Sequence, residues 1–330
     1  MTRRRATSTL VVMARDILQP LAEILEEQCG VLARQQALRA GLTDKTIEAA
    51  LRSARWKRLH LGVYVTFTGE PGRSSMMWAA LLRAGPAAIL SHQTAAELQD
   101  LLTTAAPGIH VTVPRGAQVR PIRGVVLHYS SRVRVARHPV LMPPRTRIED
   151  TVLDVANDAA DLDTALGWIF RACASRRTTP ARIEAALASR SRIRWRAELT
   201  GAIRLGGQGV HSILEFRYVS HVERPHGLPS GKRQRQVRRG VQRQYRDVEY
   251  RAFGLVVELD GQAAHPAERR WSDARRDNAT AAAGEVTLRY GWSDVTERPC
   301  LVAAEIGATL RHRGWTGKLR GCGPACPVKR

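Results

Sequence analysis

Two short apolar runs that carry acidic residues at alternate positions constrain the C-terminal part of this chain more than any other feature. The first run places Asp247 and Glu249 alternately with Val248 and Tyr250, and the second reads Val-Val-Glu-Leu-Asp-Gly at 256–261. Successive side chains of a strand point to opposite faces, so the acids of each run share one face. The alternation therefore predicts two β-strands, each with one charged face.

The four residues at 251–254 predict a hairpin connection between these strands. Such a hairpin would bring Asp247 beside Glu258 and Asp260. Ionised carboxylates near a core are costly unless they are paired or bind a metal. Because Mg²⁺ prefers oxygen ligands and usually binds through one or two carboxylates, we predict a nuclease-type Mg²⁺ site with Asp247 and Glu258 as ligands. The alternative is that nearby arginines pair with these acids at a wet sheet edge.

The composition favours a polyanionic partner. The 330 residues include 52 Lys and Arg against 30 Asp and Glu, a formal net charge of +22, and such a surface attracts nucleic acid. Residues 232–246 contain no acid and lead directly to Asp247. We expect this run to contact DNA, the alternative being a solvated basic loop in an arginine-rich protein. The candidate DNA-binding residues of the run are Lys232, Arg233, Arg235, Arg238 and Arg239.

The length and hydropathy of the chain favour a cytoplasmic protein of two or three domains. No apolar run approaches the roughly 20 residues that span a bilayer. The basic start and the apolar stretch after it resemble a signal peptide, but Arg15 and Asp16 end that stretch below the roughly 7 to 15 residues required. We therefore expect no membrane partner.

The five cysteines are too few and too scattered for a disulfide framework in a chain of this length. Cys322 and Cys326 are four residues apart, and with Cys300 and either His312 or His265 they could form a thiolate-rich structural Zn²⁺ site. The alternative is a reduced C-terminal tail that binds no metal.

The N-terminal segment has the signals of a helix-turn-helix. The apolar spacing predicts a helix over 32–40 that Gly41 can end in a left-handed conformation. Thr43 then caps a second helix that runs to about Ala54, and residues 58–65 would form a wing. The same pattern also fits a helical bundle.

This segment resembles the N-terminal winged-helix domain of AbiEi-family antitoxins of type IV toxin-antitoxin systems. The resemblance covers roughly residues 12–200, and it implies DNA binding by the winged helix and a cognate toxin or self-association as further partners. The phrases that carry it lie at 29–32, 56–59, 62–64, 78–82, 90–96 and 143–151. The implied phosphate contacts are Lys45, Arg52, Arg55, Lys57 and Arg58.

The middle segment predicts strands at 109–113 and 125–129 and helices at 151–172 and 180–188. Its three histidines, His92, His110 and His128, have no Asp or Cys at ligand spacing. We interpret them as ordinary histidines rather than metal ligands, and we expect a scaffold or partner-binding role for this segment.

The last segment resembles the very-short-patch-repair-like branch of the PD-(D/E)XK nuclease superfamily. Five elements occur in order, at 212–215, 245–247, 258–261 with His265, 275–278 and 288–292. The resemblance implies a mixed sheet flanked by helices, with Glu215 on the first helix and Asp247 and Glu258 on a central hairpin.

The chain departs from the superfamily pattern where a lysine is expected two positions after the second acid, because Asp260 stands there. An aspartate cannot supply positive charge to the scissile phosphate. His265 is the candidate base that accepts the proton of the attacking water, and Arg289 is the candidate source of the missing charge. Arg276, on a helix expected at 271–283, is a candidate phosphate contact.

Together these patterns predict a multidomain α+β or α/β chain with a winged helix-turn-helix, a mixed α/β middle region and a restriction-endonuclease-like mixed sheet flanked by helices. The expected parts are a tail at 1–15, the winged helix at 16–70, the middle region at 71–205, the nuclease-like domain at 206–318 and a tail at 319–330. The predicted function is DNA binding with metal-dependent DNA endonuclease activity. The alternative is a non-catalytic antitoxin or transcriptional regulator.

Overall fold

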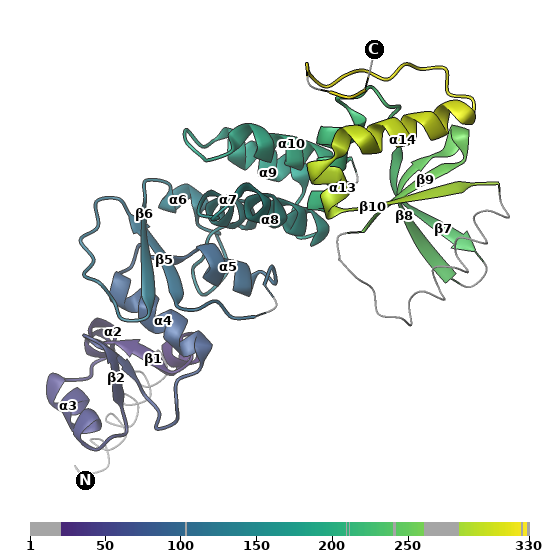
Figure 1. Ribbon diagram of the computed structural model, residues 1–330. Coiled ribbons are helices and arrows are strands. Elements are labelled where there is room, and N and C mark those ends of the chain that lie inside the picture. The colour runs from purple at the N-terminus through teal and green to yellow at the C-terminus, as the bar shows by residue number, and fades with distance from the viewer. Residues whose placement is uncertain are drawn as a thin grey trace, which may run out of the picture. The chain divides into compact units, whose positions relative to one another are not determined.

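The computed structural model describes residues 21–102, 104–208, 210, 212–239, 242–260, 284–324 and 326–328, with the main chain alone at 234–239 and 242–246 (Figure 1). The chain divides into two compact units, Met1–Val155 and Ala156–Arg330. Helices and three small sheets make it a mixed α and β protein, which confirms the predicted class at that level. The finer domain boundaries given above stay predictions.

The first sheet lies in the N-terminal part of unit 1 and has the strand order β1-β3-β2. Strand β1 (Val31–Ala33) and strand β2 (Lys57–His60) both pair antiparallel with β3 (Val63–Val65). Helices α2 (Arg34–Arg39) and α3 (Asp44–Arg52) come between β1 and β2 in the chain. A helix through residues 21–27 precedes β1.

Local sequence explains most of this arrangement. Gly41 has φ +83°, the left-handed conformation expected after a helix, and the Thr43 hydroxyl accepts a hydrogen bond from the Thr46 N–H at 3.2 Å. The helix expected from Leu32 starts only at Arg34, because Val31 and Leu32 are fully buried in strand β1. A three-residue strand is too short for the alternation of its side chains to identify it.

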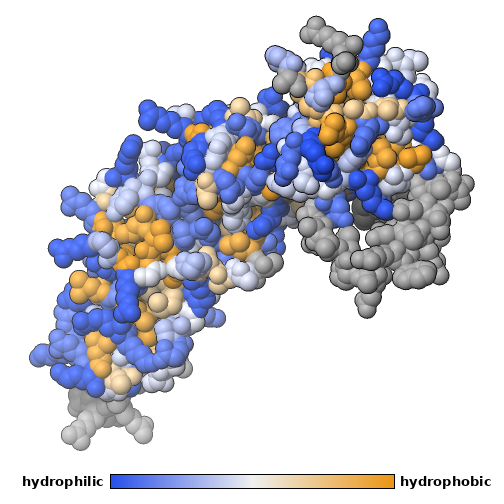
Figure 2. All heavy atoms as spheres, viewed as in Figure 1, coloured by the Kyte–Doolittle hydropathy of each residue, from blue (hydrophilic) through white to orange (hydrophobic). Residues whose placement is uncertain are grey.

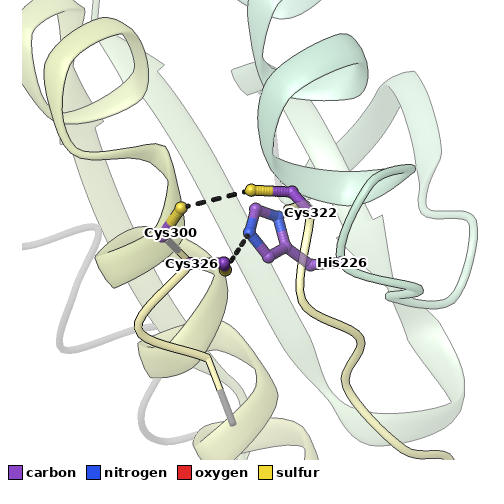
Figure 3. Close-up of side chains that lie close together, drawn as sticks. All are labelled: His226, Cys300, Cys322 and Cys326. Carbon is purple, nitrogen blue, oxygen red and sulfur yellow. Dashed lines mark hydrogen bonds between the residues drawn. The ribbon is translucent and has the colours of Figure 1, made fainter. Parts of the chain in front are cut away.

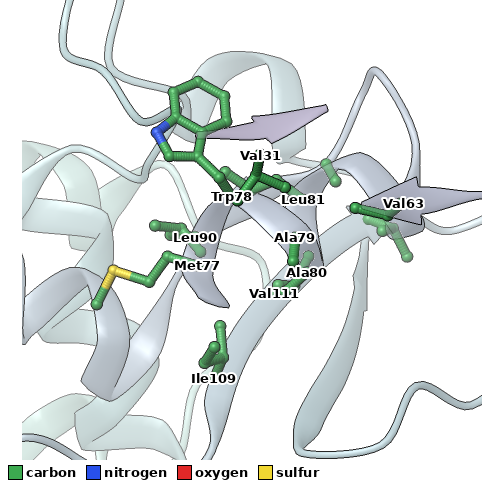
Figure 4. Close-up of a cluster of buried hydrophobic side chains, with 12 residues drawn as sticks. Val31, Val63, Met77, Trp78, Ala79, Ala80, Leu81, Leu90, Ile109 and Val111 are labelled. Atoms are coloured by element: carbon green, nitrogen blue, oxygen red, sulfur yellow. The ribbon is translucent and has the colours of Figure 1, made fainter. Parts of the chain in front are cut away.

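The second sheet of unit 1 combines β4 (Ile89–Leu90), β5 (Ile109–Pro114) and β6 (Val125–Ser130). Strand β5 pairs antiparallel with β4 and parallel with β6, and the strands predicted at 109–113 and 125–129 are present. Helix α4 (Arg73–Ala84) contacts β5, and α5 (His92–Leu98) also contacts this strand. The α4 side forms the core drawn in Figure 4, with Val31, Val63, Met77, Trp78, Leu81, Leu90, Ile109 and Val111 among its buried members.

Five helices follow the second sheet: α6 (Val133–Ala136), α7 (Ile148–Asn157), α8 (Leu162–Ala174), α9 (Pro180–Ala188) and α10 (Arg196–Gly207). The single helix expected over 151–172 is in fact two, because the Asp161 carboxylate caps α8 by accepting the Thr164 N–H at 2.7 Å. Helix α9 begins as predicted, with Thr179 as its cap and Pro180 in its first turn. Helices α8 and α9 both pack against α10.

The third sheet lies in unit 2 and has the order β10-β9-β8-β7. Its strands are β7 (Lys232–Arg239), β8 (Gln242–Tyr250), β9 (Leu255–Asp260) and β10 (Val286–Gly291). The first three are antiparallel to one another, and β10 is parallel to β9. The basic run at 232–239 is therefore a strand, and a 3-10 turn at Arg251–Phe253 makes the predicted connection between β8 and β9.

One face of this sheet packs against helical segments of unit 2. These are α11 (Ile213–Arg217), the π-helical turn η1 (Tyr218–Glu223), α13 (Trp292–Glu297) and α14 (Pro299–His312). The hydroxyls of Tyr218 and Tyr250 are 2.6 Å apart in the buried layer, and the Tyr290 hydroxyl donates to Glu305 of α14 at 3.1 Å. Among the residues that the structure describes, no helix is long and apolar enough to cross a membrane.

Candidate acidic site and metal centre

Three charged side chains lie in a row across the third sheet. Glu258 of β9 is the strand partner of Arg289 on β10. The β8–β9 register pairs Val248 with Val257, so its continuation by one residue places Asp247 opposite Glu258. Partners in neighbouring strands point to the same face, so the three side chains share it. The Arg289 Nε donates to Glu258 Oε2 at 2.9 Å, and Asp247 Oδ2 accepts the Leu259 N–H at 2.8 Å.

The acids of this row repel one another. Burial raises the pKa of Asp247 above its ordinary value, and the charges of Glu258 and Asp260 raise it further against the opposing effect of the Leu259 N–H. Asp260 ends β9, two residues beyond Glu258 and on the same face. A bound cation would remove this repulsion, so the row has the electrostatics of a cation site.

The donor geometry of the row supports a Mg²⁺ ion only weakly. In the described part of the chain, two groups of three or more His, Cys, Asp or Glu residues have donor atoms within 4.8 Å of one another. Neither group contains these acids. Glu258 also has Arg289 as its counterion, which is the arginine pairing weighed above as the alternative. A Mg²⁺ ion would take Asp247 and Glu258 as ligands in competition with that ion pair, and its other ligands would be waters.

Glu215, a further catalytic candidate, lies on α11, which contacts β9. Glu215 is buried in α11, where its N–H donates to the Ser212 hydroxyl at 3.1 Å and its carboxylate accepts from that hydroxyl at 3.2 Å. These contacts belong to the start of a helix. His265 and Arg276, together with the helix expected at 271–283, lie outside the described residues.

The basic strand divides into one surface cation and one buried cation at its start. Lys232 is exposed. Arg233 was expected to contact DNA, but only 6% of its side chain is exposed and its guanidinium forms an ion pair with Glu223. Glu223 also accepts from the Gly231 N–H and the Tyr250 hydroxyl, both at 3.2 Å. A buried carboxylate therefore already holds the charge of Arg233, which argues against a DNA contact by this residue.

The rest of the strand is described by its main-chain register. Arg235 is the strand partner of Arg246, and Arg238 is the partner of Arg243. Arg239 lies opposite Gln242 at the end of β7.

The cations expected on the winged helix lie around α3 and β2. Lys45 and Arg52 of α3 are exposed, as are Arg55 and Arg58. Lys57 is half-buried, and its ammonium lies 3.0 Å from a Glu70 carboxylate oxygen. Since surface pairs of this kind are weak, a phosphate could displace Glu70.

A cluster of one histidine and three cysteines occupies the other side of unit 2 (Figure 3). The Sγ atoms of Cys300 and Cys322 are 3.6 Å apart, and Cys326 Sγ lies 3.6 Å from His226 Nε2. All four donor atoms lie within 4.8 Å of one another. Tetrahedral zinc with ordinary bond lengths separates two sulfurs by about 3.8 Å and a sulfur and a nitrogen by about 3.6 Å. The cluster therefore has the donor set and the spacing of a structural zinc site.

Three segments distant in sequence build this centre. His226 follows η1, and its Nδ1–H donates to the Val222 carbonyl at 2.9 Å, so that Nε2 is the atom presented to Cys326. Cys300 lies in the first turn of α14. The C-terminal segment returns alongside them, because the Arg320 N–H donates to the His226 carbonyl at 2.8 Å.

The C-terminal segment also packs onto α14 through a small residue. A Cβ atom at Gly307 would lie 2.6 Å from a methyl group of Leu319, so only glycine admits this contact. Beyond it, the Cys326 N–H donates to the Gly323 carbonyl at 3.1 Å and closes the turn that brings Cys322 and Cys326 together. The C-terminal segment is thus attached to α14 through Leu319, which is buried.

The thiols influence one another strongly. Burial and the neighbouring thiols raise the pKa of Cys300 to about 12. Burial acts in the same direction on Cys326, but hydrogen bonds from the backbone of Cys322 and Val328 and from the side chains of His226 and Cys300 lower its pKa to about 6. A thiolate at Cys326 supplies the deprotonated sulfur that a metal ion needs.

The structure corrects the histidine of this site. The sequence suggested His312 or His265 as the fourth ligand, whereas His226 is the histidine found there. His312 ends α14 while Cys300 lies near its start, so about 18 Å separates them along the helix axis. His265 lies outside the described residues. No spacing pattern links His226 to cysteines 74 or more positions away.

Comparisons with known proteins leave the family of this chain open. No family model and no curated protein matches it. Among solved structures, it is similar to the crystal structure of the RV2827C protein from Mycobacterium tuberculosis, with 17% sequence identity and a TM-score of 0.38. That match covers 59% of this chain and 78% of the other.

Proposed function

We propose that this protein binds DNA through a winged helix formed by the first sheet, α2 and α3. The observation that carries the proposal is the element order: a helix, β1, α2, α3, β2 and β3, with β1 paired to β3. In a winged helix the second helix of the turn enters the major groove and the hairpin contacts the backbone beside it. The AbiEi-like resemblance supports the same assignment.

The charge on α3 agrees with this role. Lys45 and Arg52 are exposed on α3, and the Asp44 carboxylate next to them is neutralised by the Arg34 guanidinium at 2.6 Å. Arg58 is exposed on β2 of the wing. These cations would contact phosphates and fix the protein on the duplex without reading bases.

The DNA-binding proposal is tested by fluorescence anisotropy with a labelled duplex over a range of salt concentrations. The variant K45A/R52A should bind more weakly, and the slope of log K against log salt should fall by about 1.8, because two phosphate contacts are lost. The control R204A/R311A removes two exposed arginines of α10 and α14 and should leave the slope nearly unchanged. Equal binding by K45A/R52A and the wild type would overturn the proposal.

A second activity, hydrolysis of DNA phosphodiesters, is proposed for the acidic row of the third sheet. The specific observation in its favour is that Asp247, Glu258 and Arg289 lie on one face of three neighbouring strands, where Arg289 donates to Glu258. A divalent ion bound there would supply Lewis-acid stabilisation of the phosphate. In this assignment Asp247 and Glu258 bind the ion and Arg289 places positive charge against the phosphate.

Cleavage is tested with plasmid and synthetic duplexes in Mg²⁺ or Mn²⁺. D247A and E258A should each abolish nicking by the purified protein, and E297A, which removes an exposed acid of α13, should not. Nicking that survives in both D247A and E258A would assign it to another site or a contaminant. Full DNA binding without any cleavage would favour the non-catalytic regulator or antitoxin.

Zn²⁺ is the metal we propose for the cluster of His226, Cys300, Cys322 and Cys326. Three thiolates and one imidazole in this spacing suit zinc. With all four positions taken by protein, the ion would have a structural role. It would hold the C-terminal segment against His226 and α14.

A partner surface is the remaining part of the proposal. Figure 2 shows a hydrophobic area on unit 1 over the part that contains β6. Val126 and Tyr129 of β6 and Val135 of α6 are exposed apolar side chains, as is Val140. Such an area supports a scaffold or partner-binding role for the middle region. A cognate toxin and a second copy of the chain are the two proposed occupants. Sedimentation of the purified protein alone separates them, because only self-association raises its mass.

A further inference from the structure

Three histidines of unit 1 that are far apart in the sequence meet on one face of the second sheet. His110 lies on β5, His128 on β6 and His92 at the start of α5. One ring nitrogen from each histidine lies within 4.8 Å of the other two. Their spacing in the sequence does not predict that they meet, which is why the sequence alone indicates three ordinary histidines. The interpretation as three unrelated histidines is therefore replaced by that of a cluster.

The sheet register explains the meeting. His110 is the partner of Val126 and Thr112 is the partner of His128, so both histidines point to the same face, one diagonal step apart. The opposite face of β5 supplies Ile109, Val111 and Val113 to the hydrophobic core. The histidines therefore lie on the α5 side of the sheet, away from that core.

A network of hydroxyls positions the third histidine. His92 is buried, and its Nδ1 lies 2.9 Å from the Ser91 hydroxyl, which in turn accepts from Thr112 at 2.7 Å. In this arrangement the hydroxyls hold the Nδ1 side of the ring, and Nε2 is the nitrogen that His92 would direct at an ion. The His92 backbone has φ +49°, a conformation that costs a non-glycine residue free energy and gathers at functional sites.

The spacing of the nitrogens is close to what a metal ion requires. His110 Nδ1 lies 3.0 Å from His128 Nε2, where the two rings share a proton. Two nitrogens bound to one tetrahedral zinc ion are about 3.3 Å apart. An ion could therefore replace that proton with a movement of a few tenths of an ångström. Imidazole is a preferred ligand of Zn²⁺, Cu²⁺ and Ni²⁺.

The third ligand requires a larger adjustment. The ring of His92 stacks on that of His128 with centroids 3.5 Å apart and planes inclined by 12°, and the lone pairs of parallel rings do not meet at one point. His92 must rotate about its side-chain bonds to direct Nε2 at the ion. Because the backbone already places the ring beside the other two, the adjustment required is a side-chain rotation that releases the Ser91 hydroxyl.

We propose that His92, His110 and His128 bind one divalent transition-metal ion, with Zn²⁺ as the reference ion. Three protein nitrogens leave a fourth position for water, as in zinc sites that are not purely structural. This site is independent of the cysteine centre in unit 2 and of DNA binding. It is a second metal site of different chemistry in the same chain.

Cobalt distinguishes the two sites in the full-length protein. Titration of metal-free wild-type protein with Co²⁺ should show two binding events, one with a thiolate-to-cobalt charge-transfer band and one without it. H110Q and H128Q should keep the thiolate event and lose the other, with affinity reduced at least about 100-fold. H60Q, which changes a half-buried histidine of β2, should retain both.

A nuclear magnetic resonance measurement covers the case in which a histidine variant does not fold. In wild-type protein already holding one equivalent of Zn²⁺, a second equivalent should shift the ring nitrogen resonances of His92, His110 and His128. A titration with only the thiolate event, or a non-thiolate event unchanged in H110Q and H128Q, would overturn the proposal. Failure of the cysteine centre would instead appear as the loss of the thiolate band alone.

Discussion

The acidic row and the cysteine centre, both in unit 2, show two ways in which a protein can satisfy a group of metal-binding side chains. At the cysteine centre, one sulfur–sulfur distance and one sulfur–nitrogen distance are each 3.6 Å. Both are close to the separations that zinc imposes. In the acidic row, Glu258 has an arginine partner at 2.9 Å. The donor atoms of the cysteine centre are already spaced to bind an ion, whereas an ion at the acidic row must compete with Arg289 for Glu258. Donor chemistry alone thus does not decide how strongly a metal is held.

Loss of the cysteine centre should have the largest effect. C322S/C326S should lose its zinc and destabilise unit 2 by on the order of 5 kcal/mol, because metal binding contributes directly to folding. The unit-2 transition should shift down by roughly 15 °C, as measured by calorimetry. C29S, an exposed cysteine of unit 1, is the control. If C322S/C326S and the wild type held the same amount of zinc and melted at the same temperature, the cysteine centre would not be a structural zinc site.

The two faces of the third sheet extend the comparison. On the face packed against η1, Glu223 and Arg233 form a buried ion pair, whereas on the other face Glu258 and Arg289 form a partly exposed one. Burial makes the loss of one partner much more costly, because the remaining charge has little water around it.

R233M should therefore destabilise unit 2 by about 3 to 4 kcal/mol. Burial already raises the pKa of Glu223, and Arg233 opposes that shift, so the variant should raise the pKa further. Its stability should recover as the pH falls and Glu223 becomes protonated. E223Q/R233M should restore most of the loss at neutral pH. Denaturant unfolding at several pH values tests this, and a pH-independent loss would contradict it.

The sequence predicted those parts of the molecule that depend on neighbours in the chain or on adjacent strands. The Thr43 and Thr179 caps and the connection between β8 and β9 are of this kind. It did not predict that Arg233 is buried or that His226 joins three cysteines, because both depend on how distant segments pack. The three histidines of unit 1 were missed for the same reason: strand register, not sequence spacing, brings them together.

D247N should have a smaller and opposite effect. The folded-state pKa of Asp247 is raised by burial and by its acidic neighbours. The folded protein therefore loses stability as the pH rises and Asp247 becomes ionised. Asparagine has no charge to lose and still has an oxygen for the Leu259 N–H. The variant should gain about 0.5 to 1 kcal/mol at pH 7, and the gain should vanish below about pH 4. A gain that does not change with pH would have another cause.

R289A should have the smallest effect and tests the comparison most directly. If Arg289 competes with a divalent ion for Glu258, its removal should tighten Mn²⁺ binding at the acidic row about 2- to 5-fold, since a partly exposed ion pair contributes less than about 1 kcal/mol. R298A removes the surface ion pair that Arg298 forms with Asp294 of α13 at 2.8 Å, and it should leave Mn²⁺ binding unchanged. Electron paramagnetic resonance of free Mn²⁺ measures both variants.

Tighter Mn²⁺ binding combined with slower cleavage in R289A would mean that Arg289 reduces metal affinity and still helps the reaction, as expected of a cation that stabilises charge on the scissile phosphate. Weaker Mn²⁺ binding would mean that Arg289 holds Glu258 in a position to bind the ion. In that case the ion pair would organise the metal site rather than compete with it. The acidic row would then resemble the cysteine centre, in which neighbouring side chains prepare the donors for the metal.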